Sequence, residues 1–306
     1  MRHPTQPDRE VMELSEPMTM RRVKEGMKIP AMLAPALGLV VLLFGGGLLV
    51  GFAQSLGYFP ALGQRDFTLD HYISVLTDSN FIRSLWLTFR IALVATVLSS
   101  VLAVGFALVL RQKFTGSKFA TFLFQVPLPV PHLVAASGII LLITQSGLIA
   151  RFGAAAGLME VPADFPALVF DRAGIAIILT FLWKEVPFVG LVVLAILQSV
   201  GPQYEEQART LGANARQRFF NVLLPLIMPG IMSTSIIIFA FTFANYEIPL
   251  LLGVRFPTTL PVVAFRQYQD PDLALRPEAM AISIVLAFVA ILLLVAYRRL
   301  ARYAVR

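Results

Sequence analysis

Apolar segments long enough to cross a lipid bilayer recur along this chain. A helix that crosses the hydrocarbon core needs about 20 mostly apolar residues. Six segments meet this requirement, at residues 29–52, 85–110, 119–143, 173–200, 222–246 and 279–297. Only 14% of the 306 residues are charged, whereas a soluble domain has about 25%. We therefore predict an all-α, polytopic membrane protein with about six transmembrane helices.

The distribution of basic residues predicts how these helices are oriented. Six spans put both termini on one side of the membrane, and that side carries sixteen of the 25 Lys and Arg residues. By the positive-inside rule it is cytoplasmic. We expect a cytoplasmic N-terminal tail at 1–28, a membrane domain at 29–298 and a cytoplasmic C-terminal tail at 299–306. The net charge of +7 is spread in short clusters beside the spans, which favours a lipid bilayer over nucleic acid as the partner.

The third predicted span contains Pro127, Pro129 and Pro131 within five residues. Each proline lacks a backbone donor and clashes with the preceding turn, so no regular helix can continue through them. Irregular backbone at membrane depth survives where it is buried in protein or lines a watery cavity. A packing kink and a lining of the transport pathway, with Pro129 as a candidate residue, are both open.

Ionisable residues inside the spans are candidates for the pathway, because burying them in a membrane is costly. Lys184 and Glu185 lie near the middle of the fourth span, and Glu247 follows Tyr246 at the end of the fifth. For Lys184 and Glu185, an ion pair with another helix is favoured slightly over contact with a solute. Glu247 is a candidate gate or solute contact, and Tyr246 a candidate lining residue or a packing aromatic. Arg90, in the second span, is expected to cap an interface.

The 201–221 loop, between the fourth and fifth spans, has the pattern of a short helix, a turn and a second helix. Pro202 suits a first helical position, and Glu205 and Glu206 favour the positive end of the helix dipole. Gly212 lies where a helix stop requires a residue that tolerates positive φ. Such a loop could dock a partner protein or lie on the bilayer as an amphipathic helix.

The spacing of five residues in and after this loop, Glu206, Ala208, Gly212, Leu224 and Pro225, resembles a known motif. It is similar to the cytoplasmic "EAA" loop of the permeases of binding-protein-dependent ABC importers, with Gln207 in place of the middle alanine and Val222 in place of isoleucine. The span before the loop, from Leu182 to Gln198, also looks like the corresponding span of these permeases. The resemblance covers roughly residues 80 to 300 and is nearest to the spermidine/putrescine-type branch.

This resemblance implies the type I permease fold of ABC importers in a bacterial inner membrane. The 201–221 loop would form the coupling helix, seated in a groove of an ATPase subunit. The implied partners are two ATP-binding subunits, a second permease subunit (a copy or a homologue) and an extracytoplasmic solute-binding protein. The sequence has no GxxxxGK[ST] phosphate loop, so ATP and Mg²⁺ are expected on the partner ATPase, and the chain itself is expected to be neither an enzyme nor a cofactor-binding protein.

Other classes of function leave different signatures. His3, His71 and His132 lack metal-ligand spacing, so neither a metal site nor a catalytic residue is predicted. A secondary transporter or channel would also show six spans, broken helices and buried charges, but it would not need the docking loop. Glu185 and Glu247 suggest a polyamine or similar organic cation as the solute, whereas Lys184 leaves thiamine, phosphonates and other small solutes open.

Overall fold

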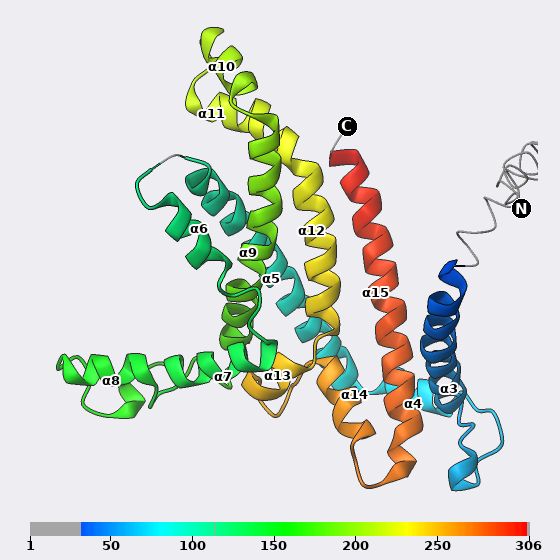
Figure 1. Ribbon diagram of the computed structural model, residues 1–306. Helices are drawn as coiled ribbons and strands as arrows, with labels where there is room; N and C mark the ends of the chain where they lie inside the picture. Colours follow the sequence, from blue (N-terminus) through cyan, green and yellow to red (C-terminus); the bar gives the residue numbers. More distant parts are fainter. Residues whose placement is uncertain (1–31, 113, 305–306) are drawn as a thin grey trace, which may run out of the picture. The chain divides into compact units, whose positions relative to one another are not determined.

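The computed structural model describes residues 32–112 and 114–304, and within them every regular element is a helix (Figure 1). The predicted tail at 1–28 lies outside the described residues. At the other end, α15 continues to Ala304, into the predicted C-terminal tail. The chain divides into two compact units, residues 1–54 and 55–306, which are described separately.

The first unit contains the first apolar helix. Its described part runs from Met32 to Ser55, the residue at which the second unit begins, and includes a π-helical segment, η1 (Val41–Gly45), followed by α3 (Gly46–Ser55). Three successive glycines, Gly45 to Gly47, lie where the π segment gives way to α3. The helix has the length and composition of a membrane span.

Four long helices form the frame of the second unit. They are α5 (Ser79–Leu110), α9 (Ile175–Val200), α12 (Leu224–Ala244) and α15 (Arg276–Ala304). The helix α5 packs along α9 and α12, and α12 also contacts α15 (Figure 1). Small residues of α5, among them Ala103 and Ala107, are fully buried beside apolar residues of α9 and α12. This close approach is typical of helix packing inside membranes.

The third predicted span is not one helix. Its first part is α6 (Ser117–Gln125), and the second is α7 (His132–Ile143), which a turn separates from α8 (Leu148–Ala155). Residues 126–131, which we call the proline break, are not helical, as the three prolines predict. In Figure 1, α7 and α8 run across the direction of α9 and α12. The helix α7 ends at Ile143, where the third span was predicted to end, and the apolar stretch continues after the turn through α8 to Ala155.

Short helices gather at the two ends of the frame (Figure 1). The end that carries the 201–221 loop has α10 (Gln203–Thr210), α11 (Ala215–Arg218) and the π segment η4 (Phe219–Leu223). The remaining short elements are η2 (Pro60–Leu62), α4 (Asp70–Thr77), η3 (Pro162–Asp164), α13 (Glu247–Leu252), α14 (Leu260–Tyr268) and η5 (Leu273–Leu275).

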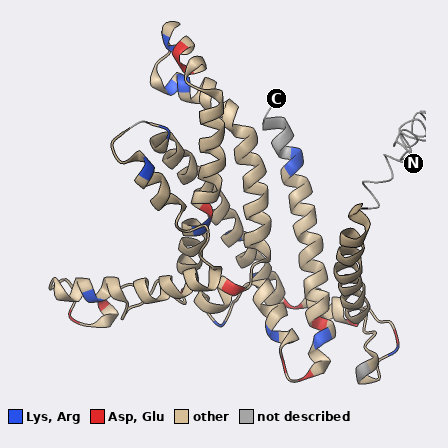
Figure 2. Cartoon of the chain, in the orientation of Figure 1, with Lys and Arg blue, Asp and Glu red and all other residues tan. Residues whose placement is uncertain are grey.

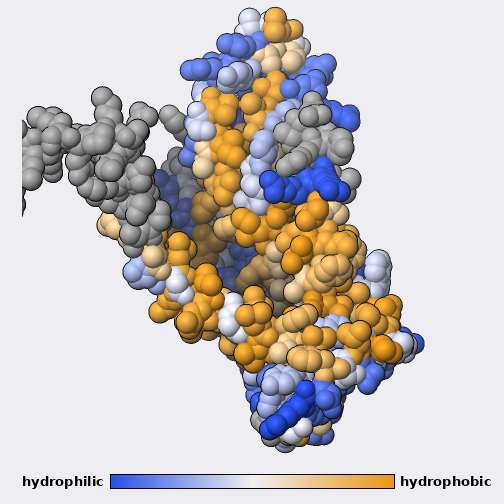
Figure 3. All heavy atoms as spheres, turned by 90° about the vertical axis from the view of Figure 1, so that its right-hand side faces the viewer, coloured by the Kyte–Doolittle hydropathy of each residue, from blue (hydrophilic) through white to orange (hydrophobic). Residues whose placement is uncertain are grey.

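Among the described residues, six helical stretches have the length and composition of membrane spans, which confirms the predicted all-α, six-span architecture. Charged residues are concentrated towards the two ends of the long helices, with few between them (Figure 2). The face shown in Figure 3 is mostly hydrophobic through its middle, and its hydrophilic side chains gather near the ends. This pattern matches a protein surrounded by lipid rather than by water.

Candidate functional site

The stop of α10 explains part of the motif spacing. The Gly212 amide donates to the Arg209 carbonyl, and the Ala213 amide donates to the Ala208 carbonyl, both at 3.0 Å. These two bonds make a Schellman motif, in which the residue after the helix cap takes a left-handed conformation. Gly212 has φ +83°, as predicted. The interval from Ala208 to Gly212 is therefore the interval that this helix stop requires.

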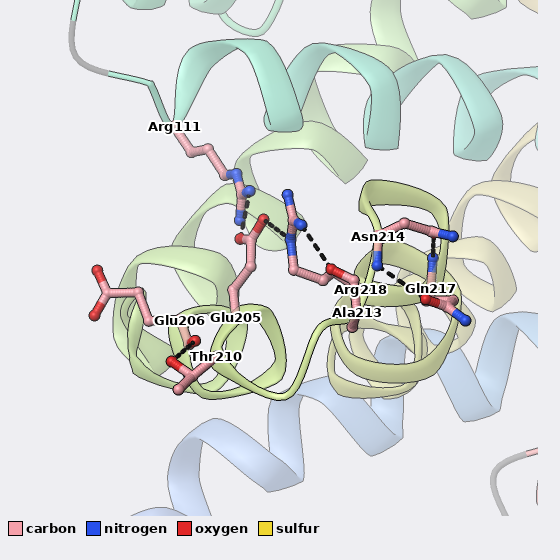
Figure 4. A network of polar contacts seen from close by, with 8 residues as sticks. All are labelled: Arg111, Glu205, Glu206, Thr210, Ala213, Asn214, Gln217 and Arg218. Atoms are coloured by element: carbon pink, nitrogen blue, oxygen red, sulfur yellow. Dashed lines mark hydrogen bonds and ion pairs between the residues drawn. The ribbon is translucent and has the colours of Figure 1, made fainter.

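A second cap starts the next helix only one residue later. The Asn214 side chain accepts from the Gln217 amide, and the Gln217 side chain accepts from the Asn214 amide, each at 2.9 Å (Figure 4). This reciprocal capping box satisfies donors that a helix start leaves free. The turn between α10 and α11 is therefore fixed on both sides by hydrogen bonds that need only local sequence.

Glu205 ties the loop to the rest of the frame. Its carboxylate accepts from the Arg111 guanidinium at 2.7 Å and lies 3.5 Å from Arg218 Nε (Figure 4). The Arg218 side chain also donates to the Ala213 carbonyl at 3.0 Å, which bonds it across the turn. Arg111 is the cap residue that follows α5, so one carboxylate joins α10, α11 and the end of α5.

Glu206, the motif residue, points the other way. Its carboxylate lies away from the network in Figure 4, and it has no ion pair with any described residue. The internal contact of Glu206 is its carbonyl, which accepts from the Thr210 hydroxyl at 3.0 Å. Leu211, in the turn, is 88% exposed. The loop therefore exposes the Glu206 carboxylate and the Leu211 side chain, while the ion pairs of Glu205 hold its opposite side.

The last two motif residues lie where the loop becomes α12. Leu224 packs against the apolar cluster shared by α5, α9 and α12. Pro225 lies in the first turn of α12, directly after the π segment η4, where its missing amide costs little. The five motif residues thus belong to one continuous stretch, from α10 through α11 and η4 into α12.

Lys184 lies on α9 at the proline break. Its ammonium donates to the carbonyls of Pro127, Leu128 and Val130, at 2.7, 3.1 and 2.6 Å. The side chain is 6% exposed. An ammonium has three donors, so all three are used to satisfy carbonyls that the interrupted helix leaves without intrahelical partners.

This arrangement differs from the expected ion pair. Among the described residues, neither Lys184 nor Glu185 pairs with a charged group of another helix. Glu185 is 8% exposed, and no described residue hydrogen-bonds to its carboxylate. Arg90 behaves like Lys184, because it donates to the carbonyls of Arg172 and Ala173 at 3.1 and 2.8 Å. The buried Lys184 and the partly exposed Arg90 therefore both bind irregular backbone.

The other pathway candidates lie near a second interruption, between α12 and α13. Glu247 begins α13 and is partly exposed. Tyr246 stacks on Phe265 of α14 with ring centroids 4.4 Å apart. His132, which opens α7, lies within electrostatic range of both Lys184 and Glu247. The helix α13, which Glu247 begins, packs against α7 and α9, while Tyr246 packs towards α14.

The contact between Arg111 and Glu205 was not predicted from the sequence, which indicated Glu205 only as a partner of the helix dipole. The contact from Arg111 to Glu205 joins residues 94 positions apart, and no local pattern announces it. Within the described part of the chain, no group of three or more His, Asp or Glu residues could hold a metal ion.

The family of the chain follows from its sequence. Residues 95–306 match the family described as "Binding-protein-dependent transport system inner membrane component". The chain is 31% identical, over 240 residues that cover 72% of it and 76% of the relative, to the inner membrane ABC transporter permease protein YdcU of Escherichia coli strain K12. It is 28% identical over 231 residues, covering 74% and 79%, to the sulfate transport system permease protein CysW of a Synechocystis species.

A solved structure agrees at the level of the fold. A chain in the crystal structure of a bacterial ABC transporter, involved in the import of the acidic polysaccharide alginate, has a TM-score of 0.79 and 18% identity. The similarity covers 95% of this chain and 100% of that one. The family match, with which the fold agrees, defines a polytopic permease, the non-catalytic subunit of an ABC importer. This chain belongs to the binding-protein-dependent transport system inner membrane component family. The finer spermidine/putrescine-type assignment is not confirmed.

Proposed function

We propose that this chain is a membrane-spanning subunit of an ATP-driven importer, and that the 201–221 loop receives motion from an ATPase subunit. The observation that carries the proposal is the loop's construction. Its turn is fixed internally by a Schellman motif and a capping box, while Glu206 and Leu211 face outward. A rigid element with an exposed carboxylate and an exposed leucine suits a partner protein, because contact with the partner would remove the apolar surface of the leucine from water.

The proposed complex follows from the family. It contains two ATP-binding subunits, which bind ATP and Mg²⁺, a second permease subunit and an extracytoplasmic solute-binding protein. In this arrangement both termini and the 201–221 loop are cytoplasmic, in agreement with the excess of Lys and Arg on that side. This chain contributes no catalytic residue and no cofactor. Glu206, Ala208, Gly212, Leu224 and Pro225 couple ATP hydrolysis to movement of the helices.

For the solute we propose a small organic cation such as a polyamine. Lys184 is committed to three carbonyls and has no donor left for an anion. The acidic Glu185 and Glu247 then remain as groups that could replace part of the hydration of an ammonium ion. The named relatives include a sulfate permease, so an anion is the competing possibility. Tight binding of an anion or a sugar by the partner binding protein, with none of polyamines, would exclude the cation.

Copurification tests the coupling role. Leu211→Asp should reduce recovery of the ATPase subunits with the tagged permease, because it places a charge in the proposed interface. Leu158→Asp is a matched control, since Leu158 is also exposed, at 77%, but lies outside the loop. Equal loss of ATPase from both variants, or from neither, would refute the interface. Uptake that continues without any ATPase subunit would identify a secondary transporter or channel.

A further inference from the structure

Two covalent connections join α10 and α11 to the frame. One leads back to α9 through residues 201–202, and the other leads on to α12 through η4. The longest described helix, α5, does not adjoin the loop in the chain, although it packs along both α9 and α12. Movement of the loop therefore reaches α5 through side chains or not at all.

The ion pair between Arg111 and Glu205 supplies a direct contact. Its two side chains are 27% and 24% exposed, and the nitrogen and oxygen are 2.7 Å apart. Arg218 shares the same carboxylate, and its bond to the Ala213 carbonyl connects the pair to the turn. In Figure 4 the Arg111 side chain extends from the end of its helix towards Glu205.

We propose that Arg111 and Glu205 form a third, non-covalent connection between the 201–221 loop and the frame, so that the end of α5 and its hairpin with α6 move together with α10. Neighbouring glutamates then have different tasks: Glu206 faces the partner, and Glu205 transmits movement inward. Both are positioning residues rather than solute contacts. This inference rests on the proposed function.

The hairpin has a consequence for the pathway. The helix α6 leads directly into the proline break, whose carbonyls bind Lys184. A movement of the α5–α6 hairpin would therefore reach the irregular segment at membrane depth through only nine residues of helix. The loop, the ion pair, the hairpin and the break form one contiguous route.

The first test measures coupling in proteoliposomes that contain the whole complex and its binding protein. Arg111→Ala should keep the ATPase subunits bound but lower the solute moved per ATP by up to about fivefold, the upper end of the range for a partly exposed ion pair. Arg111→Lys should restore part of the loss. The control is Lys118→Ala, which removes an exposed charge from the same hairpin and should leave the ratio unchanged.

The second test does not depend on how well Arg111→Ala folds. The natural chain contains no cysteine, so cysteines at 111 and 205 can be joined specifically by a short bis-maleimide. If the two positions move together, joining them should raise uptake above that of the unjoined double variant. Loss of uptake on joining, or a normal ratio in Arg111→Ala, would overturn the link. Absence of ATPase subunits from the wild-type complex would instead refute the proposed function.

Discussion

Replacing Lys184 by methionine tests whether this lysine stabilises the proline break or binds the solute. Methionine has a similar length but neither charge nor donors, so the change leaves three carbonyls without their partner. A hydrogen bond to a charged group contributes about 1.5–3 kcal/mol, which gives a gross loss of about 4.5–9 kcal/mol. Removing a lysine from the centre of a membrane helix recovers about 2.5–3.5 kcal/mol. The net loss of stability is therefore on the order of 3 kcal/mol.

The assay compares thermal unfolding of the purified permease in detergent. The matched control is Lys118→Met, which makes the same chemical change at an exposed position on α6 and should alter stability by less than about 0.5 kcal/mol. Amide hydrogen exchange at Val126, Leu128 and Val130, the residues of the proline break that have an amide hydrogen, should increase in Lys184→Met and not in the control.

Two results would contradict this reasoning. Equal stabilities of the two methionine variants would show that the three bonds contribute nothing net. Normal stability together with lost uptake in Lys184→Met would mean that the ammonium serves the solute rather than the backbone.

Further predictions concern the loop, the topology, the pathway and one surface turn. Gly212→Val should abolish uptake while the subunit stays in the membrane, because a left-handed conformation costs a residue with a Cβ about 1–2 kcal/mol. The control is Gly63→Val, because Gly63 has φ +75° and is equally uncrowded. Normal uptake with Gly212→Val would refute the coupling role. A cysteine at Asn214 should resist an impermeant thiol reagent added outside intact cells, and labelling there would refute the proposed topology. Glu247→Gln should slow uptake of an organic cation without loss of ATPase subunits, and unchanged uptake would remove Glu247 from the pathway. Hydrogen bonds from the Val161 and Glu160 amides hold the pKa of the Asp164 carboxyl below its ordinary value. The turn at Asp164 should therefore be ordered at neutral pH and loosen as the pH falls through that lowered pKa. A fluorophore in the turn should report this transition, and Asp164→Asn should remove it.

Features governed by local chemistry were predictable from the sequence. The six apolar stretches, the interruption at Pro127 to Pro131 and the positive φ of Gly212 each depend on residues that are close together in the chain. The motif around Gly212 also led to the family, although not to its branch.

Features that depend on distant residues were not predictable. The carbonyl partners of Lys184 lie 54 to 57 positions earlier. A lysine inside a span suggested a carboxylate as its partner rather than backbone carbonyls. The partner of Glu205 is 94 positions away. The helix α8, which follows α7 after a turn, was also not predicted as part of the third span.

The three hydrogen bonds from Lys184 to the proline break bear on how the chain is inserted into the membrane. A lysine near the middle of a span disfavours insertion of that span by about 2.5–3.5 kcal/mol when it has no partner. Its three carbonyl partners belong to an earlier part of the chain, so they have already been synthesised when Lys184 leaves the ribosome. The order of the segments therefore provides a prepared acceptor for the charged helix, and a rearranged chain in which α9 preceded α6 would lose that advantage.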